Sequence, residues 1–138
     1  MKLILQVFIL SALLLTSSFA SEFTQVKEIT LKKDVEKTIL VRYDDKEKVL
    51  TFRWTLYKNG GLIVFRSYDT IVAQNILYLR HENQSFRVIV KPSGVNFYDK
   101  PFVLIRFKKF NDDTREATFE LFLSDDSKDI KLDYKKNI

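Results

Sequence analysis

From Lys48 to Tyr57, large apolar residues stand at every second position, which is the pattern of a β-strand with one buried face. The inward set is predicted to be Leu50, Phe52, Trp54 and Leu56, and the outward set to be Val49, Thr51, Arg53, Thr55 and Tyr57. Asn59-Gly60-Gly61 follows directly, and an Asn-Gly pair tolerates the positive φ angles of a tight hairpin turn. The sequence therefore predicts a β-hairpin over residues 48–68.

The same alternation recurs along the chain and predicts further strands over residues 28–32, 38–43, 70–79, 84–91, 102–110, 115–124 and 130–134. Asn75 interrupts the expected inward face of its strand. The remaining inward faces are predicted to be Ile39, Val41 and Tyr43; Ile71, Ala73, Leu77 and Leu79; Phe86, Val88 and Val90; Val103, Ile105 and Phe107; Ala117, Phe119, Leu121 and Leu123; and Ile130, Leu132 and Tyr134.

Strands at roughly ten-residue spacing, joined by short turns rich in Asp, Asn, Ser and Gly, are typical of all-β folds. We predict a single domain over residues 21–138, an antiparallel β-sandwich of immunoglobulin-like or jelly-roll type with 7–8 strands. A small β-barrel is the alternative. Trp54 is present, but the Cys…Trp…Cys pattern of an immunoglobulin-family domain is not, because the chain has no cysteine.

The first twenty residues predict export. Lys2 precedes an apolar run from Leu3 to Leu15, and Ser18-Phe19-Ala20 offers small residues where a signal peptidase would cut. The run is shorter than the about 20 residues of a membrane-spanning helix, so a signal peptide over residues 1–20 is favoured over an anchor. We expect no membrane span after cleavage, and a periplasmic or secreted protein.

Composition narrows the chemistry that is open to this chain. The absence of cysteine excludes disulfides, thiol nucleophiles and thiolate metal sites. The formal net charge is +5, but cations and carboxylates are interspersed, which is typical of a solvated surface. Nucleic acid is therefore not an expected partner.

No set of residues predicts catalysis. The single histidine, His81, lies in a polar stretch between two strands and is expected to be an exposed loop residue. Asp125, Ser127 and Asp129 have the alternating spacing of calcium ligands, but they are also ordinary turn formers, and both interpretations stay open. We predict no catalytic residues, no metal site and no cofactor.

A cationic, partly aromatic surface is the candidate binding site. Residues 102–110 carry a second face that is apolar at one end and cationic in the middle, comprising Phe102, Leu104, Arg106, Lys108 and Phe110. If the strands lie close together, this face predicts a binding patch formed by Arg53, Tyr57, Arg106, Lys108 and Lys109.

These observations favour an exported, soluble, non-catalytic β-sandwich that binds another macromolecule, with a protein of the cell envelope as the expected partner. Sandwiches of this kind bind through loops, faces or open edge strands. A small-ligand-binding protein, for a lipid, glycan or metal, is the alternative. An enzyme is the less favoured third hypothesis.

Overall fold

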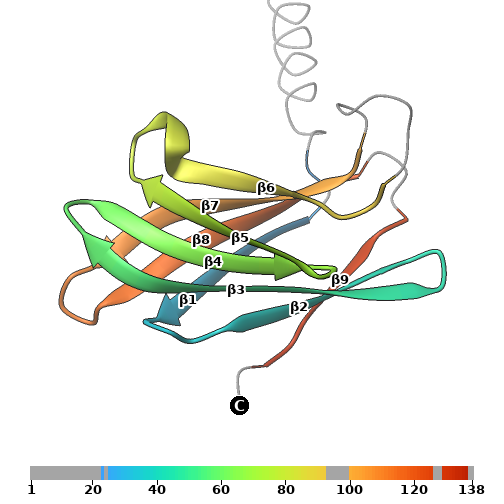
Figure 1. Ribbon diagram of the computed structural model, residues 1–138, viewed down its shortest axis with the longest axis horizontal. Helices are drawn as coiled ribbons and strands as arrows, with labels where there is room; N and C mark the ends of the chain where they lie inside the picture. The colour runs from blue at the N-terminus through green and yellow to red at the C-terminus, as the bar shows by residue number, and fades with distance from the viewer. Residues whose placement is uncertain (1–22, 24, 93–99, 126–128, 137–138) are drawn as a thin grey trace, which may run out of the picture.

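The computed structural model describes residues 23, 25–92, 100–125 and 129–136, and within them the chain forms two antiparallel sheets packed face to face (Figure 1). The four-stranded sheet has the order β1-β8-β7-β6, with bounds β1 Gln25–Lys32, β6 Ser85–Ile89, β7 Phe102–Asn111 and β8 Glu116–Ser124. The five-stranded sheet has the order β5-β4-β3-β2-β9, with bounds β2 Lys37–Tyr43, β3 Lys46–Lys58, β4 Gly61–Tyr68, β5 Ile71–Tyr78 and β9 Lys131–Tyr134. A short 3₁₀ turn, η1 Glu82–Gln84, lies between β5 and β6.

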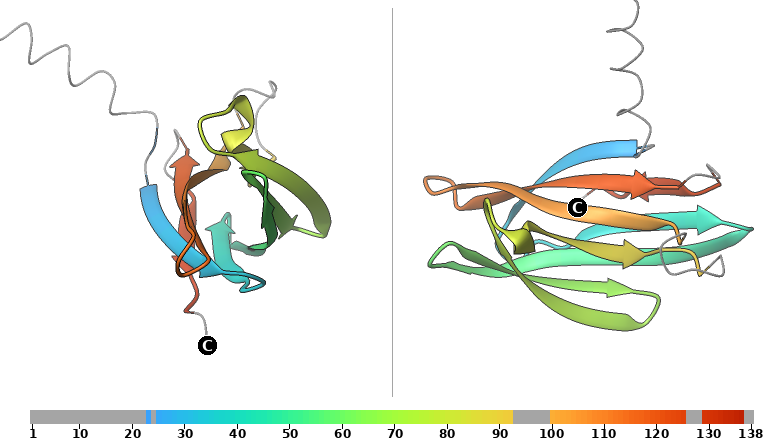
Figure 2. Two further views of the ribbon diagram at one scale, coloured as in Figure 1. Left: turned by 90° about the vertical axis from the view of Figure 1, so that its left-hand side faces the viewer. Right: turned by 90° about the horizontal axis from the view of Figure 1, so that it is seen from above.

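This architecture confirms the predicted all-β sandwich, and the two separate sheets differ from the closed barrel that was the alternative. The described residues form nine strands, one more than the upper end of the predicted seven or eight, and each of them overlaps a segment in which alternation predicted a strand. Figure 2 shows the two layers from the end and from above. The signal-peptide prediction falls on residues 1–20, which lie outside the described residues.

Strands β2 to β5 form a meander with three two-residue turns. The turns are Asp44-Asp45, Asn59-Gly60 and Asp69-Thr70, and all six residues have positive φ angles. Positive φ at both turn positions matches the right-handed twist of the strands on either side. The predicted hairpin over residues 48–68 is confirmed as β3 and β4.

Thr70 is the least suitable residue in these turns, because a β-branched side chain at φ 72° is strained. We expect Thr70→Gly to raise the free energy of unfolding by about 0.5–1 kcal/mol, since glycine adopts this conformation without a steric penalty. Urea unfolding of the variant would measure the change. The reciprocal substitution Gly60→Thr, at φ 78°, is the control and should destabilise the protein, whereas equal shifts in both variants would contradict this reasoning.

The inner faces of both sheets meet in one hydrophobic core. Phe52 from the five-stranded sheet lies edge-on to Phe119 from the four-stranded sheet, with ring centroids 5.2 Å apart. The predicted inward faces of segments 38–43, 84–91 and 115–124 are all buried, as are Val103, Ile105 and Phe107 of β7. Period-two alternation therefore assigned most of the core correctly.

A β-bulge changes the assignment at the end of β3. The pairing with β4 shifts register between Trp54 and Leu56, so Thr55 is an extra residue. Leu56, predicted to face inward, is consequently 45% exposed. Tyr57, predicted to face solvent, instead packs against the core, with its ring stacked on Phe110 at a centroid distance of 3.9 Å.

A second bulge has the same effect in β7. The pairing with β8 shifts between Phe107 and Lys109, which turns Phe110 away from the outer face that the alternation predicted for it. Phe110 packs against the core, edge-on to Trp54 at 5.6 Å.

Strand β5 departs furthest from its predicted pattern. It lies at the border of its sheet and pairs only with β4. Ile71 was expected to face inward but is 71% exposed, whereas Leu77 is buried as predicted. Asn75 does face inward, and its Oδ1 accepts a hydrogen bond from Arg66 Nε at 3.0 Å, which explains a polar residue at this position.

Burial of a tyrosine in β9 predicts a loss of stability at high pH. Desolvation of its phenolate raises the pKa of Tyr134 to about 12, and burial also raises the pKa of Tyr68. The folded-state pKa of Tyr134 exceeds its unfolded value, near 10. The stability that the protonated side chain contributes is therefore complete below pH 10 and is lost as the pH rises towards 12. Since the ring is partly solvated, we expect Tyr134 alone to cost less than the full shift implies, about 1 kcal/mol or less by pH 11. Denaturant unfolding at pH 9 and pH 11 should show a smaller fall for Tyr134→Phe than for the unmodified protein, and an equal fall would refute the assignment.

Candidate functional site

The outer face of the four-stranded sheet carries apolar side chains where a solvated face would carry polar ones. The strand register places Val26 of β1 opposite Phe122 of β8, and Phe122 opposite Leu104 of β7. Leu104 in turn lies opposite Arg87 of β6. One row across all four strands is therefore apolar until it reaches an arginine at the β6 border.

Neighbouring rows extend this row into a continuous surface. Val26 is 62% exposed, and the ring of Phe23 lies 5.0 Å from that of Phe122 between centroids. We define the outer aromatic patch as Phe23, Val26, Ile89, Phe102, Leu104 and Phe122; all except Val26 are partly buried.

Two arginines lie over the aromatic rings of this patch. The Arg87 guanidinium carbon lies 4.5 Å from the centroid of the Phe102 ring, and that of Arg106 lies 5.8 Å from the Phe122 ring. A guanidinium above an aromatic face is held by cation–π attraction and stays planar and accessible. Apolar area and fixed positive charge are thus combined on one face.

Ion pairs border the patch in the next outward row of the register, where Glu28, Glu120 and Arg106 lie side by side. Lys108 Nζ donates a hydrogen bond to Glu28 Oε2 at 2.7 Å, and this bond lowers the pKa of Glu28 and raises the pKa of Lys108. Arg106 donates to Glu120 on the neighbouring strand. Both pairs are exposed to solvent, so they contribute little to stability, but they fix the positions of the cations.

The structure brings together three of the five predicted binding residues. Arg106, Lys108 and Lys109 are exposed on the four-stranded sheet, where the β7 bulge places two consecutive lysines outside. Arg53 lies on the outer face of the opposite sheet, over Phe65 at 5.9 Å. Tyr57 is between the sheets and is not part of any outer surface, so the predicted patch is divided by the body of the sandwich.

Arg87, Phe122, Val26 and Ile89 were not identified from the sequence as site residues. The sequence feature that could have indicated this surface is Phe122, a large aromatic residue on the otherwise polar face of the segment 115–124. Its neighbours across the sheet depend on strand order, which alternation within one strand does not reveal.

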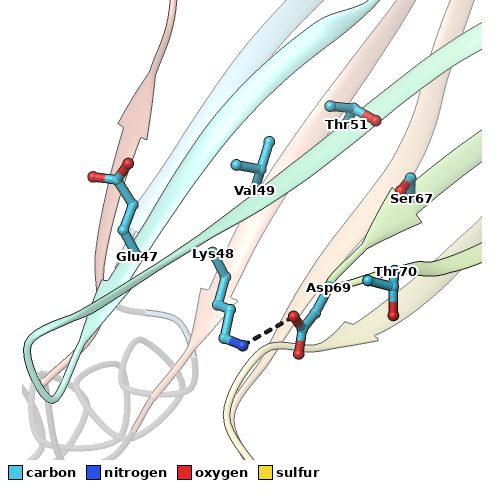
Figure 3. Close-up of a pocket in the computed structure, with 7 residues that line it drawn as sticks. All are labelled: Glu47, Lys48, Val49, Thr51, Ser67, Asp69 and Thr70. Atoms are coloured by element: carbon cyan, nitrogen blue, oxygen red, sulfur yellow. Dashed lines mark hydrogen bonds and ion pairs between the residues drawn. The ribbon is translucent and has the colours of Figure 1, made fainter.

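A shallow depression of about 380 Å³ on the five-stranded sheet is a second candidate site (Figure 3). It is lined by Glu47, Lys48, Val49, Thr51, Ser67, Asp69 and Thr70. Both carboxylates already have cationic partners, since Lys48 Nζ lies 2.9 Å from Asp69 Oδ1 and Arg42 Nε lies 2.9 Å from Glu47 Oε2. The hollow therefore offers hydroxyl groups but no unneutralised acid or base.

The described residues contain no group of three or more His, Asp or Glu side chains arranged to hold a metal ion. His81 Nδ1 accepts a hydrogen bond from the backbone N–H of Asn83 at 3.2 Å and is exposed. Asp125 is buried, and its Oδ2 accepts from the backbone N–H of Ile130 at 2.9 Å, which is the local bonding of a turn. Ser127 of the calcium hypothesis lies outside the described residues.

Comparison with known proteins gave no match to a family model, to a curated protein sequence or to a solved structure. Within the part of the chain that the structure describes, no helix has the length and apolar character needed to cross a membrane.

Proposed function

We propose that this chain is an exported, non-catalytic β-sandwich that binds another protein of the cell envelope through its outer aromatic patch. The observation that carries the proposal is the row of partly exposed apolar side chains between Arg87 and Val26, on a sheet face that alternation would otherwise make polar.

The composition of the patch supports a protein partner. Aromatic residues and arginine are enriched at the centres of protein interfaces, where they contribute most of the binding energy. Phe102 and Phe122 each have an arginine above the ring, so one contact surface offers both apolar area and donors for carboxylates. The matching partner surface has an apolar centre with acidic side chains opposite Arg87 and Arg106. The net charge, +4 once Lys2 is removed with the predicted signal peptide, would favour encounter with such a surface.

The position of the patch also supports the proposal. It is built on the middle of a four-stranded sheet, whose backbone is fixed by pairing on both sides of β7 and β8. Side chains on such a rigid support lose little conformational freedom on binding. The predicted signal peptide supplies the argument for export.

In-cell photocrosslinking tests this proposal. A photoreactive amino acid replaces Ile89 at the border of the patch in the tagged full-length chain, and the crosslinked protein is identified and purified. Its affinity for the unmodified protein is then compared with its affinity for Leu104→Asp. Val49→Asp, at an exposed apolar position on the other sheet, is the matched control.

We expect Leu104→Asp to weaken binding at least about tenfold, because it places a charge in an apolar contact, and Val49→Asp to leave it unchanged. No crosslinked protein, or equal affinities for the two variants, would overturn the proposal.

A further inference from the structure

Strand β5 is a border strand with an unused backbone edge. The two-residue turn Asp69-Thr70, which joins β4 to β5, makes Tyr68 and Ile71 a hydrogen-bonded pair. From Ile71 onward, the N–H and C=O groups of successive residues point alternately towards β4 and away from it. Val72, Gln74, Ile76 and Tyr78 therefore direct their N–H and C=O groups away from β4. Among the described residues, no strand pairs with this edge.

The edge also lacks the usual protection against pairing. The segment Ile71–Tyr78 contains no charged residue, proline or glycine, and Val72 is 70% exposed. Natural border strands are normally protected by charges, proline, bulges or a covering segment. The opposite border of the same sheet follows this rule, because β9 carries Lys131 and Asp133.

The edge of β6, which lies across the sandwich from β5, is covered by side chains. Arg66 Nη1 donates to the carbonyl oxygen of Arg87 at 3.3 Å, and the Tyr68 hydroxyl donates to the carbonyl oxygen of Val90. Both donors come from β4 and reach across the opening between the sheets. Within the part of the chain that the structure describes, no such side-chain hydrogen bond is made to the outer edge of β5.

We propose that the partner is a second copy of this chain, paired antiparallel to β5 about a twofold axis. The charges at the two ends of β5 are the reason for this choice. Asp69 lies two residues before the strand, and its half-exposed carboxylate accepts from Lys48 Nζ through Oδ1 at 2.9 Å, which leaves room on the solvent side for a second cation. The exposed Arg80 lies two residues after the strand and has no ion pair among the described residues. An antiparallel twofold arrangement brings Arg80 of each copy to Asp69 of the other, so the edge is complementary to itself.

Backbone direction and the end charges together select the register. Residues that direct their backbone groups outward must pair with one another, and among the registers this allows, the charge match favours Val72 opposite Tyr78 and Gln74 opposite Ile76 of the second copy. Asn75 then lies on the twofold axis. In the alternative register, Gln74 would lie opposite Gln74 of the second copy. Arg80 would then lie beyond the Asp69-Thr70 turn of that copy and no longer beside its Asp69.

The outer faces of the two sheets would then join in one ten-stranded sheet. Tyr78 covers Gly61 on the next strand, at which an added Cβ would lie 3.0 Å from the tyrosine ring. Val72 of the second copy would pack beside Tyr78 and lose its exposure. This contact uses a surface different from the outer aromatic patch, so the dimer does not depend on the proposed function and is tested separately from it.

Cysteine crosslinking tests the dimer and its register, because the chain has no cysteine of its own. Purified Gln74→Cys and Ile76→Cys proteins are oxidised separately and as a mixture. Cross-strand neighbours have Cα atoms about 5.5 Å apart, within the range that a disulfide spans. We expect disulfide-linked dimer mainly in the mixture. Val49→Cys, exposed on the same sheet away from β5, is the control and should form no disulfide-linked dimer.

Sedimentation equilibrium gives an independent measure. We expect a reversible dimer whose dissociation constant rises at least tenfold in Val72→Lys, since a lysine on an edge strand opposes pairing. Arg80→Glu should also weaken the dimer, whereas Lys58→Glu, another exposed cation, should not. A monomer at all concentrations, or no crosslinking in the mixture above the Val49→Cys control, would overturn the proposal. Either result would leave binding at the outer aromatic patch unaffected.

Discussion

Replacing Trp54 by alanine is expected to lower the free energy of unfolding by about 3–5 kcal/mol, the cost typical of truncating a buried large aromatic side chain. Trp54 is almost fully buried, and its ring is edge-on to Phe110. Its Nε1 also donates a hydrogen bond of 2.8 Å to the carbonyl oxygen of Leu31 in β1. Since β1 and β3 belong to different sheets, the indole joins the two layers by packing and by a hydrogen bond.

The variant Trp54→Phe separates these two contributions. It retains most of the apolar volume but leaves the Leu31 carbonyl without its donor, so we expect a loss of about 1–3 kcal/mol. Urea unfolding followed by circular dichroism measures both variants, because tryptophan fluorescence is lost with the only tryptophan. If Trp54→Phe were as stable as the unmodified protein, the hydrogen bond to β1 would make no net contribution to the free energy of unfolding.

Alternation predicted most of the fold because it is a local property of each strand. A residue of β8 such as Phe119 is assigned to the core by its position in the period of two, whatever strand lies beside it. The prediction failed where an extra residue shifts the period. Thr55 and Lys108 are such residues, and the sequence contains no proline or glycine beside either to mark a bulge.

The candidate site could be predicted only in part, for a different physical reason. Arg106, Lys108 and Lys109 lie within one strand, so their proximity follows from local geometry. Arg53 was grouped with them on charge alone, but sheet membership depends on long-range pairing, and it lies on the other layer. The patch as observed also needs Phe23 and Val26 from β1 and its approach, about a hundred residues before Phe122 in sequence.

The second large effect is expected at Phe119, the residue that links the two inner faces. Its ring contacts Phe52 across the sandwich at 5.2 Å and lies 6.1 Å from Phe107 on the neighbouring strand. Phe119→Ala removes both contacts and leaves a cavity between two sheets whose paired strands restrict collapse. We expect a loss of about 3–5 kcal/mol, measured by urea unfolding.

Phe122→Ala is the matched control, since it is the same substitution three residues along β8 on the opposite face. Phe122 is partly exposed and no second sheet of the described residues lies above it, so its removal leaves no enclosed cavity and should cost about 1 kcal/mol or less. The same variant should weaken the proposed partner binding, in which its ring lies beneath Arg106. Equal destabilisation by the two substitutions would mean that the outer face is covered like a core, and it would contradict the assignment of this face to a binding surface.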